Sequence, residues 1–194
     1  YSTRSPATQQ DLLQAWGALD GGPGARFDLQ AVLRLFTALF LHAGWAHLLG
    51  NLVFLLIFGL PAEKAIGPWR LLLLFLLGGA VANLAAVLLL AGPGHVIIGA
   101  SGAISALIGA YLALFPRARL GVVLPLGLFL EFVRAPASLL IGIWALLQVV
   151  FAYIGPAFGM VAWAAHVAGF LFGEVFALLE RRAVERRLRR QKGF

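Results

Sequence analysis

A serine flanked by glycines opens one of the apolar segments of the chain, in the stretch GASGAISALIGAY of residues 99–111. If a helix begins at Ser101, its hydroxyl group lies beside free backbone N–H groups and the positive end of the helix dipole. Gly99 and Gly102 permit a tight turn and the close approach of a substrate backbone. These residue types suit a serine that acts as a nucleophile.

Three further polar side chains fall at the depth of Ser101 on other apolar segments. With a helical rise of about 1.5 Å per residue, Ser101 lies 16 residues, about 24 Å, from the charge that ends its segment. His166 and His47 lie 15 and 16 residues, about 22 and 24 Å, from the corresponding charges. The three reference charges are Arg117, Arg181 and Glu63. Asn51 follows His47 by four residues and therefore shares its helix face.

The chemistry that this layer could perform is acyl transfer. His166 would accept the hydroxyl proton of Ser101 as general base and return it to the leaving amine. His47, Asn51 and the backbone amide of Ser101 could donate hydrogen bonds to a developing oxyanion. Glu174 lies eight residues beyond His166, about 12 Å away. The pattern therefore predicts a Ser–His dyad without an acid.

The composition indicates a membrane protein. The chain has 194 residues, of which 61% are hydrophobic and 12% charged, whereas about a quarter of a soluble domain is charged. Five apolar runs, compared with the roughly 20 residues that cross a membrane, predict an all-α bundle of five transmembrane helices. The runs are 46–60, 69–91, 101–115, 138–155 and 160–180. The run from Ser101 is too short to cross fully, so loop 92–100 is expected to dip into the protein above a recessed polar cavity.

Basic residues predict the orientation of these helices. They gather after the first and third apolar runs and in the tail 181–194, which holds seven of the 15 Lys and Arg residues. The positive-inside rule places these parts in the cytoplasm and residues 1–41 outside. We therefore expect an external segment (1–41), a membrane-embedded core (42–180) and a basic cytoplasmic tail that binds anionic lipid rather than nucleic acid. The chain starts at Tyr1 without a preceding apolar run, so we also expect an upstream helix or targeting segment.

Three motifs resemble those of the rhomboid intramembrane serine proteases of bacterial type. They are HAGWAHLLGN, GASG and AHVAGFLFG, and together with the intervening helices they cover about residues 30–180. The resemblance implies that Ser101 is the nucleophile and His166 its base. It also implies that His47, Asn51 and the Ser101 amide form the oxyanion hole.

The resemblance extends to supporting residues and has two departures. It implies that His42 shapes the site from a loop, and that Gly169 and Gly173 let the last helix press against the serine helix, in agreement with the preference for small residues at such contacts. The family core has six helices, and the first has no counterpart here. A Trp-Arg pair common in the family's external loop is replaced by Leu33 and Arg34.

Other interpretations of these residues stay open. Ser101 could ease helix packing together with neighbouring glycines, and His42 and His47 could be interfacial histidines. The spacing of His42, His47 and Asn51 does not suit a zinc helix, and the chain has no cysteine, so we expect neither metal nor cofactor. Among the other polar groups, we expect Ser105 to donate a hydrogen bond to the carbonyl of Ser101. We expect interhelical hydrogen bonds for Asn83 and Gln148. His95 is expected at a solvated loop position and Glu174 at the membrane interface.

The sequence therefore predicts a multi-pass serine endopeptidase of the bacterial inner membrane that cleaves transmembrane segments of other proteins. The alternative is a proteolytically inactive rhomboid-like protein that binds transmembrane clients. Inactive relatives are expected to lack the serine or the histidine, and both are present. A small transporter is expected to carry paired charges or broken helices near the midplane, and only Glu174 comes close.

Overall fold

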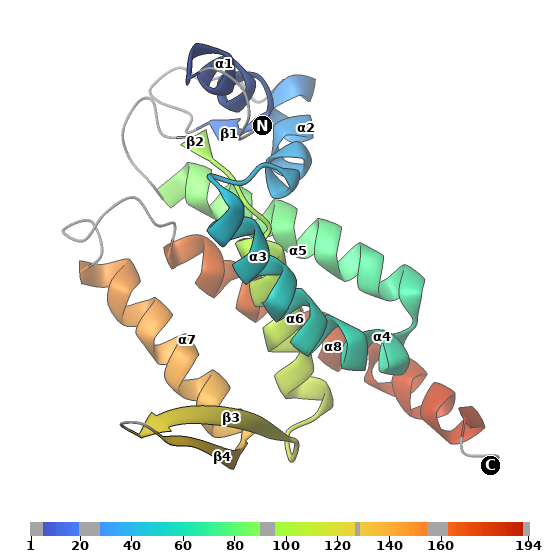
Figure 1. The fold of residues 1–194 in the computed structure, drawn as a ribbon. Helices are drawn as coiled ribbons and strands as arrows, with labels where there is room; N and C mark the ends of the chain where they lie inside the picture. Colours follow the sequence, from blue (N-terminus) through green and yellow to red (C-terminus); the bar gives the residue numbers. More distant parts are fainter. Residues whose placement is uncertain (1–5, 20–27, 90–95, 127–128, 155–162, 192–194) are drawn as a thin grey trace.

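Five helical segments form a bundle in the computed structural model of the chain (Figure 1). The structure describes residues 6–19, 28–89, 96–126, 129–154 and 163–191. In chain order the segments are α3 Trp45–Phe54 with its continuation through a π-helical stretch Leu55–Gly59 and α4 Leu60–Ile66, then α5 Pro68–Leu89, α6 Ser101–Leu114, α7 Ala137–Ile154 and α8 Trp163–Gln191. Within the described residues, each apolar run predicted from the sequence is helical, which confirms the fold class. Residues 90–91, 155 and 160–162 of these runs, and 92–95 of the loop expected to dip into the protein, lie outside the described residues.

The helices are those of a multi-pass membrane protein. Trp45–Ile66, Pro68–Leu89 and Trp163–Arg181 are each long and apolar enough to cross a membrane, whereas Ser101–Leu114 and Ala137–Phe151 are apolar but shorter. Exposed apolar side chains cover the outer faces of these helices, which is expected where lipid surrounds a bundle. On α5, α7 and α8 they include Leu72, Leu73, Leu77, Leu146, Val149, Leu171, Val175 and Leu178.

Two of these helices continue beyond the apolar runs. The first run was predicted to end at residue 60, but α4 extends the helix to Ile66. A π-helical stretch at Leu55–Gly59 precedes Pro61, which cannot donate a backbone hydrogen bond. The last run was predicted to end at 180, but α8 continues to Gln191, so most of the basic tail is helical. Hydropathy marks where the apolar surface ends, not where the helix ends.

The serine helix α6 lies at the centre of the bundle, between α5 and α8. All of its residues from Gly102 to Tyr111 are buried. The approach of α8 is close because glycines face backbone: a Cβ on Gly169 would overlap the carbonyl oxygen of Gly102, and a Cβ on Gly173 would overlap that of Ala106. The two helices can therefore lie this close only where side chains are absent.

The N-terminal residues pack over one end of the bundle (Figure 1). They form α1 Pro6–Trp16, β1 Ala18–Leu19, α2 Leu29–Thr37 and a 3₁₀ turn Ala38–Phe40. The strand β1 pairs antiparallel with β2 Val96–Ile97, with Ala18 opposite Ile97. Side chains of α2 donate to the end of α1, from Arg34 Nε to the Ala15 carbonyl (3.1 Å) and from the Thr37 hydroxyl to the Trp16 carbonyl (2.6 Å).

Asn83 joins this N-terminal layer to the bundle. Its side-chain amide, on α5, donates to the Leu35 carbonyl of α2 over 2.8 Å and is almost fully buried. The sequence-based expectation of an interhelical hydrogen bond from Asn83 is confirmed.

A β-hairpin at the opposite end of the bundle was not predicted. The strands β3 Arg119–Leu126 and β4 Phe129–Pro136 pair antiparallel, and Arg119 Nη2 donates to the Arg134 carbonyl over 2.8 Å. From the sequence, the segment after the third apolar run was expected only to be a basic cytoplasmic part of the chain. Gly121 and Pro125 disfavour a helix here, and Pro is tolerated because a two-stranded sheet has only edge strands.

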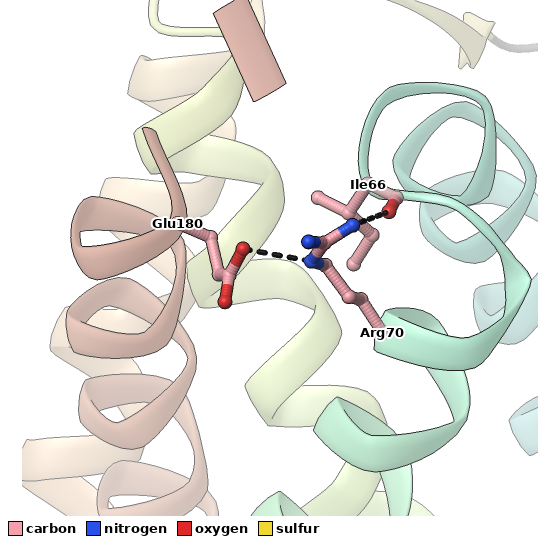
Figure 2. A network of polar contacts seen from close by, with 3 residues as sticks. All are labelled: Ile66, Arg70 and Glu180. Carbon is pink, nitrogen blue, oxygen red and sulfur yellow. Dashed lines mark hydrogen bonds and ion pairs between the residues drawn. The ribbon is translucent and has the colours of Figure 1, made fainter. Parts of the chain in front are cut away.

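An ion pair links two helices near the same end (Figure 2). Arg70 Nε, at the start of α5, lies 2.8 Å from Glu180 Oε2 of α8, and a second guanidinium nitrogen lies 3.5 Å from the Ile66 carbonyl. Both charges lie at the end of an apolar stretch, and the pair joins α5 to α8 at this level. The strands β3 and β4 and the last turns of α8 lie toward this end as well (Figure 1).

Candidate active site

Ser101 and His166 meet where two helices begin. Ser101 is the first residue of α6, and His166 lies in the first turn of α8. The distance from Ser101 Oγ to His166 Nε2 is 2.9 Å, which is within hydrogen-bond reach for direct proton transfer. The glycine contacts between α6 and α8 hold these two helix starts together. Residues 65 positions apart in the sequence thus form one hydrogen-bonded pair.

Gln148 of α7 contacts the other nitrogen of the same ring. Its Oε1 lies 2.8 Å from His166 Nδ1, and the residue is only 6% exposed. An amide oxygen can only accept a hydrogen bond, so this contact is a hydrogen bond in the tautomer with the proton on Nδ1, in which Nε2 can accept from the Ser101 hydroxyl. The expected interhelical hydrogen bond of Gln148 is confirmed, but sequence reasoning missed that its partner is His166. The available signal was an amide within an otherwise apolar run.

The Nε2 atom of His47 lies beside Gly99, in the loop before Ser101. Its Nδ1 accepts a hydrogen bond from the backbone N–H of Ala43 (3.3 Å), so that Nε2 is the nitrogen that can donate. A Cβ placed on Gly99 would lie 2.8 Å from this Nε2 and 3.8 Å from Asn51 Nδ2. Within the part of the chain that the structure describes, Asn51 Nδ2 is buried without a hydrogen-bond partner. Two donors therefore converge beside Gly99.

The loop before Ser101 is held by backbone contacts. Gly99 has φ +108°, a conformation that favours glycine, and its N–H donates to the Ala38 carbonyl over 2.9 Å. Ala100 occupies the N-cap of α6 and supplies no side-chain hydrogen bond to it. The N-cap residue therefore leaves the first N–H groups of α6 without a side-chain partner, which is the usual condition for a helix start that binds an anionic group.

The remaining predicted residues lie around this centre. The Ser105 hydroxyl donates to the Ser101 carbonyl over 2.8 Å, which confirms the bond expected from the sequence. The His42 ring packs edge-on against His47 at 5.2 Å, and its Nε2 is buried without a partner among the described residues. Burial lowers the pKa of His42 below its ordinary value, and the neighbouring His47 adds to this effect. His95 lies outside the described residues.

A cavity of about 410 Å³ adjoins the Asn51 side of the site. Its walls are mainly apolar side chains of α3, of the segment before α3, and of α5 and α6, including Leu39, Trp45, Leu48, Phe75 and Ile104. His42 and Asn51 are its polar members, and Ala100 connects it to the start of α6. The cavity can therefore accommodate an apolar group beside Asn51.

The fold and this arrangement define a class of protein: a multi-pass membrane protein with a Ser–His pair at the start of a buried helix. The family model of the Rhomboid domain matches residues 29–183. The chain belongs to the rhomboid family.

Curated relatives agree with this assignment. The chain is 38% identical over 101 residues to "RHOMBOID-like protein 1" of Arabidopsis thaliana, covering 52% of this chain and 25% of that protein. It is 39% identical over 80 residues to "Rhomboid-related protein 1" of Caenorhabditis elegans, covering 41% and 22%. It is also 39% identical over 80 residues to the protein of Bacillus subtilis named "Putative rhomboid protease YdcA", covering 41% and 39%. The chain thus spans about a quarter of the length of the first of these relatives.

Proposed function

We propose that this protein is an intramembrane serine endopeptidase. The observation that carries the proposal is the 2.9 Å contact between Ser101 Oγ and His166 Nε2 at the start of a buried helix. In the first step His166 takes the hydroxyl proton while Oγ bonds to the substrate carbonyl carbon. His166 then gives this proton to the leaving amine, and an acyl-enzyme remains. In the second step water attacks the ester, passes its proton through His166 to Oγ, and releases the acid.

The negative charge that forms on the carbonyl oxygen needs donors in place before the reaction. His47 Nε2 and Asn51 Nδ2 converge beside Gly99, two residues before the proposed nucleophile. The backbone N–H of Ser101, the first residue of α6, is the third proposed donor. Asn51 Nδ2 makes no hydrogen bond with the described residues, so no internal partner has to be displaced. Such preorganised donors supply much of the rate enhancement in acyl transfer.

Transmembrane segments are the proposed substrates, because the site lies among helices that cross the membrane. A peptide bond inside a helix is hydrogen-bonded and shielded, so cleavage requires local unwinding, for which a polar recess supplies partners. By resemblance to the family, segments with small residues at the cleavage point and a helix that unwinds easily would be preferred.

The membrane orientation is also part of the proposal. The basic residues after the first and third apolar runs and in the tail favour a cytoplasmic C-terminus and an external N-terminal segment, in a bacterial inner membrane. The strands β3 and β4 and the last turns of α8 lie at the end of the bundle opposite α1 and α2 (Figure 1), which supports this arrangement. The basic tail would bind anionic lipid headgroups.

A fluorophosphonate that reacts with activated serines tests the proposal. The purified protein should label and should cleave a transmembrane substrate, whereas Ser101→Ala should do neither. The matched control is Ser105→Ala, one helical turn along α6, which removes a hydroxyl that donates to the Ser101 carbonyl and should behave like the unaltered protein. If Ser101→Ala still cleaves, or if the unaltered protein neither labels nor cleaves, the proposal is wrong. The second result would favour an inactive protein that binds transmembrane clients.

A further inference from the structure

Gln148 is a buried amide on a helix whose outer face is apolar. Its neighbours Leu147 and Val149 are exposed and apolar, whereas Gln148 is 6% exposed and faces inward. Burying an amide in such a place is unfavourable unless it is hydrogen-bonded. Its oxygen meets His166 Nδ1 at 2.8 Å, and the other nitrogen of the same ring meets Ser101. Gln148 therefore bonds to the group whose protonation decides whether Ser101 can be activated.

We infer that Gln148 is a positioning residue that holds His166 in the tautomer and orientation needed for general-base catalysis. The inference rests on the proposed function and deepens it, because it adds a third group to the Ser–His pair. Which ring nitrogen of a neutral histidine carries the proton is set by the hydrogen bond that the other nitrogen makes. With the Gln148 oxygen as acceptor, Nδ1–H persists and Nε2 keeps its lone pair directed at the Ser101 hydroxyl.

A neutral partner suits this location better than a carboxylate would. An ionised carboxylate in a membrane-embedded bundle loses its hydration, and this cost can exceed the attraction that it gains. The amide oxygen accepts from Nδ1–H when the ring is neutral and continues to accept after the ring takes the proton of Ser101. The proton moves only between Oγ and Nε2, and Gln148 gains and loses no atom.

The groups around the ring come from several elements. Ser101 of α6 and Gln148 of α7 bond to its two nitrogens, and the Trp163 indole of α8 packs edge-on at 6.0 Å. Among the described residues, His47 is the titratable group whose charge acts on His166. A change at position 148 therefore alters the environment of the ring without altering another charged contact.

Three variants separate positioning from packing. Gln148→Met keeps much of the side-chain volume but has no amide oxygen to accept from Nδ1–H. Gln148→Glu restores an acceptor with the same reach. Leu147→Met is the matched control, because it places the same side chain one residue away on the lipid-facing side of α7.

The kinetic readouts are the rate of fluorophosphonate labelling, kcat and KM for a transmembrane substrate, and Tm. For Gln148→Met we expect a loss of about tenfold in labelling rate and kcat with little change in KM, since one neutral hydrogen bond is removed. Gln148→Glu should recover labelling at high pH and move the acid limb of the pH–rate profile upward, because a carboxylate favours the protonated ring. Leu147→Met should react normally. The inference is wrong if Gln148→Met reacts as fast as Leu147→Met. It is also wrong if the lower rate of Gln148→Met merely accompanies a lower Tm and the pH–rate profile of Gln148→Glu is unchanged.

A spectroscopic readout separates this inference from the proposed function. Nitrogen chemical shifts of ¹⁵N-histidine in the intact protein report which ring nitrogen is protonated. His166, assigned by comparison with His166→Gln, should show Nδ1–H in the unaltered protein and lose this preference in Gln148→Met. If the tautomer is unchanged while Ser101-dependent cleavage is present, the inference fails and the function stands. If the tautomer shifts but no cleavage occurs, the function fails and the positioning by Gln148 stands.

Discussion

Gly99→Ala provides a demanding test of the oxyanion site, because one methyl group would strain two features at once. The backbone at Gly99 has φ +108°, and such a conformation costs a side-chain-bearing residue about 1–3 kcal/mol. The new Cβ would also lie 2.6 Å from His47 Cε1 and 2.8 Å from Nε2. Carbon atoms pack best at about 3.5–4.0 Å, so the ring would have to retreat by roughly 1 Å.

This displacement moves one proposed donor away from the oxyanion while Ser101 and His166 keep their contact. A misplacement of about 1 Å can cost about 100-fold in rate, and we expect a fall of that order in kcat and in the rate of fluorophosphonate labelling. The backbone strain should also lower Tm. The control is Gly50→Ala, a helical position beside Asn51 where an added Cβ meets no atom within 4 Å. Labelling of Gly99→Ala as fast as that of Gly50→Ala would refute the assignment of His47 as a donor.

The other predictions concern the second donor, the helix contact and the orientation. Asn51→Ala should lower kcat by about 10²- to 10³-fold. Tm should change little, because Asn51 Nδ2 makes no hydrogen bond with the described residues. An unchanged kcat would show that Asn51 is not an oxyanion donor. Gly173→Ala should destabilise the fold by about 1–3 kcal/mol, measured by thermal unfolding, because the added methyl group would push α8 away from α6. The control is Gly142→Ala, where an added Cβ meets no atom within 4 Å. Equal Tm values for the two variants would contradict the close approach of the helices. Since the chain has no cysteine, a cysteine introduced at Gln10 should label with an impermeant maleimide in intact cells, and labelling only after lysis would reverse the orientation.

Residue spacing was sufficient to predict the elements that carry the candidate site. The helix that starts at Ser101 follows from the glycines before it and the apolar run after it, and equal distances to the flanking charges predicted that His166 would lie at the same level. Depth along a helix can be counted in residues, because the rise per residue is fixed. The close approach of Ser101 and His166 was therefore within reach of sequence reasoning, although their chemical roles remain predictions.

Rotation about the helix axis could not be obtained in the same way. That Gln148 faces His166 depends on how α7 turns against α8, and an apolar run with a lone amide leaves this open. The strands over 119–126 and 129–136 were missed because their Gly, Pro and charged residues predicted a connection rather than a regular element. The pairing of β1 with β2 joins two-residue strands, which are too short to show an alternating pattern.

That pairing has a mechanical consequence. Ala18 and Ile97 are 79 positions apart in the sequence, yet they share one antiparallel ladder, and Ile97 is only two residues from Gly99. A force applied to the N-terminal segment is therefore transmitted to the backbone that faces the two donors. The loop before Ser101 is therefore held in part by a segment that contributes no group to the candidate site, and we expect that loosening residues 6–19 would also loosen the proposed oxyanion site.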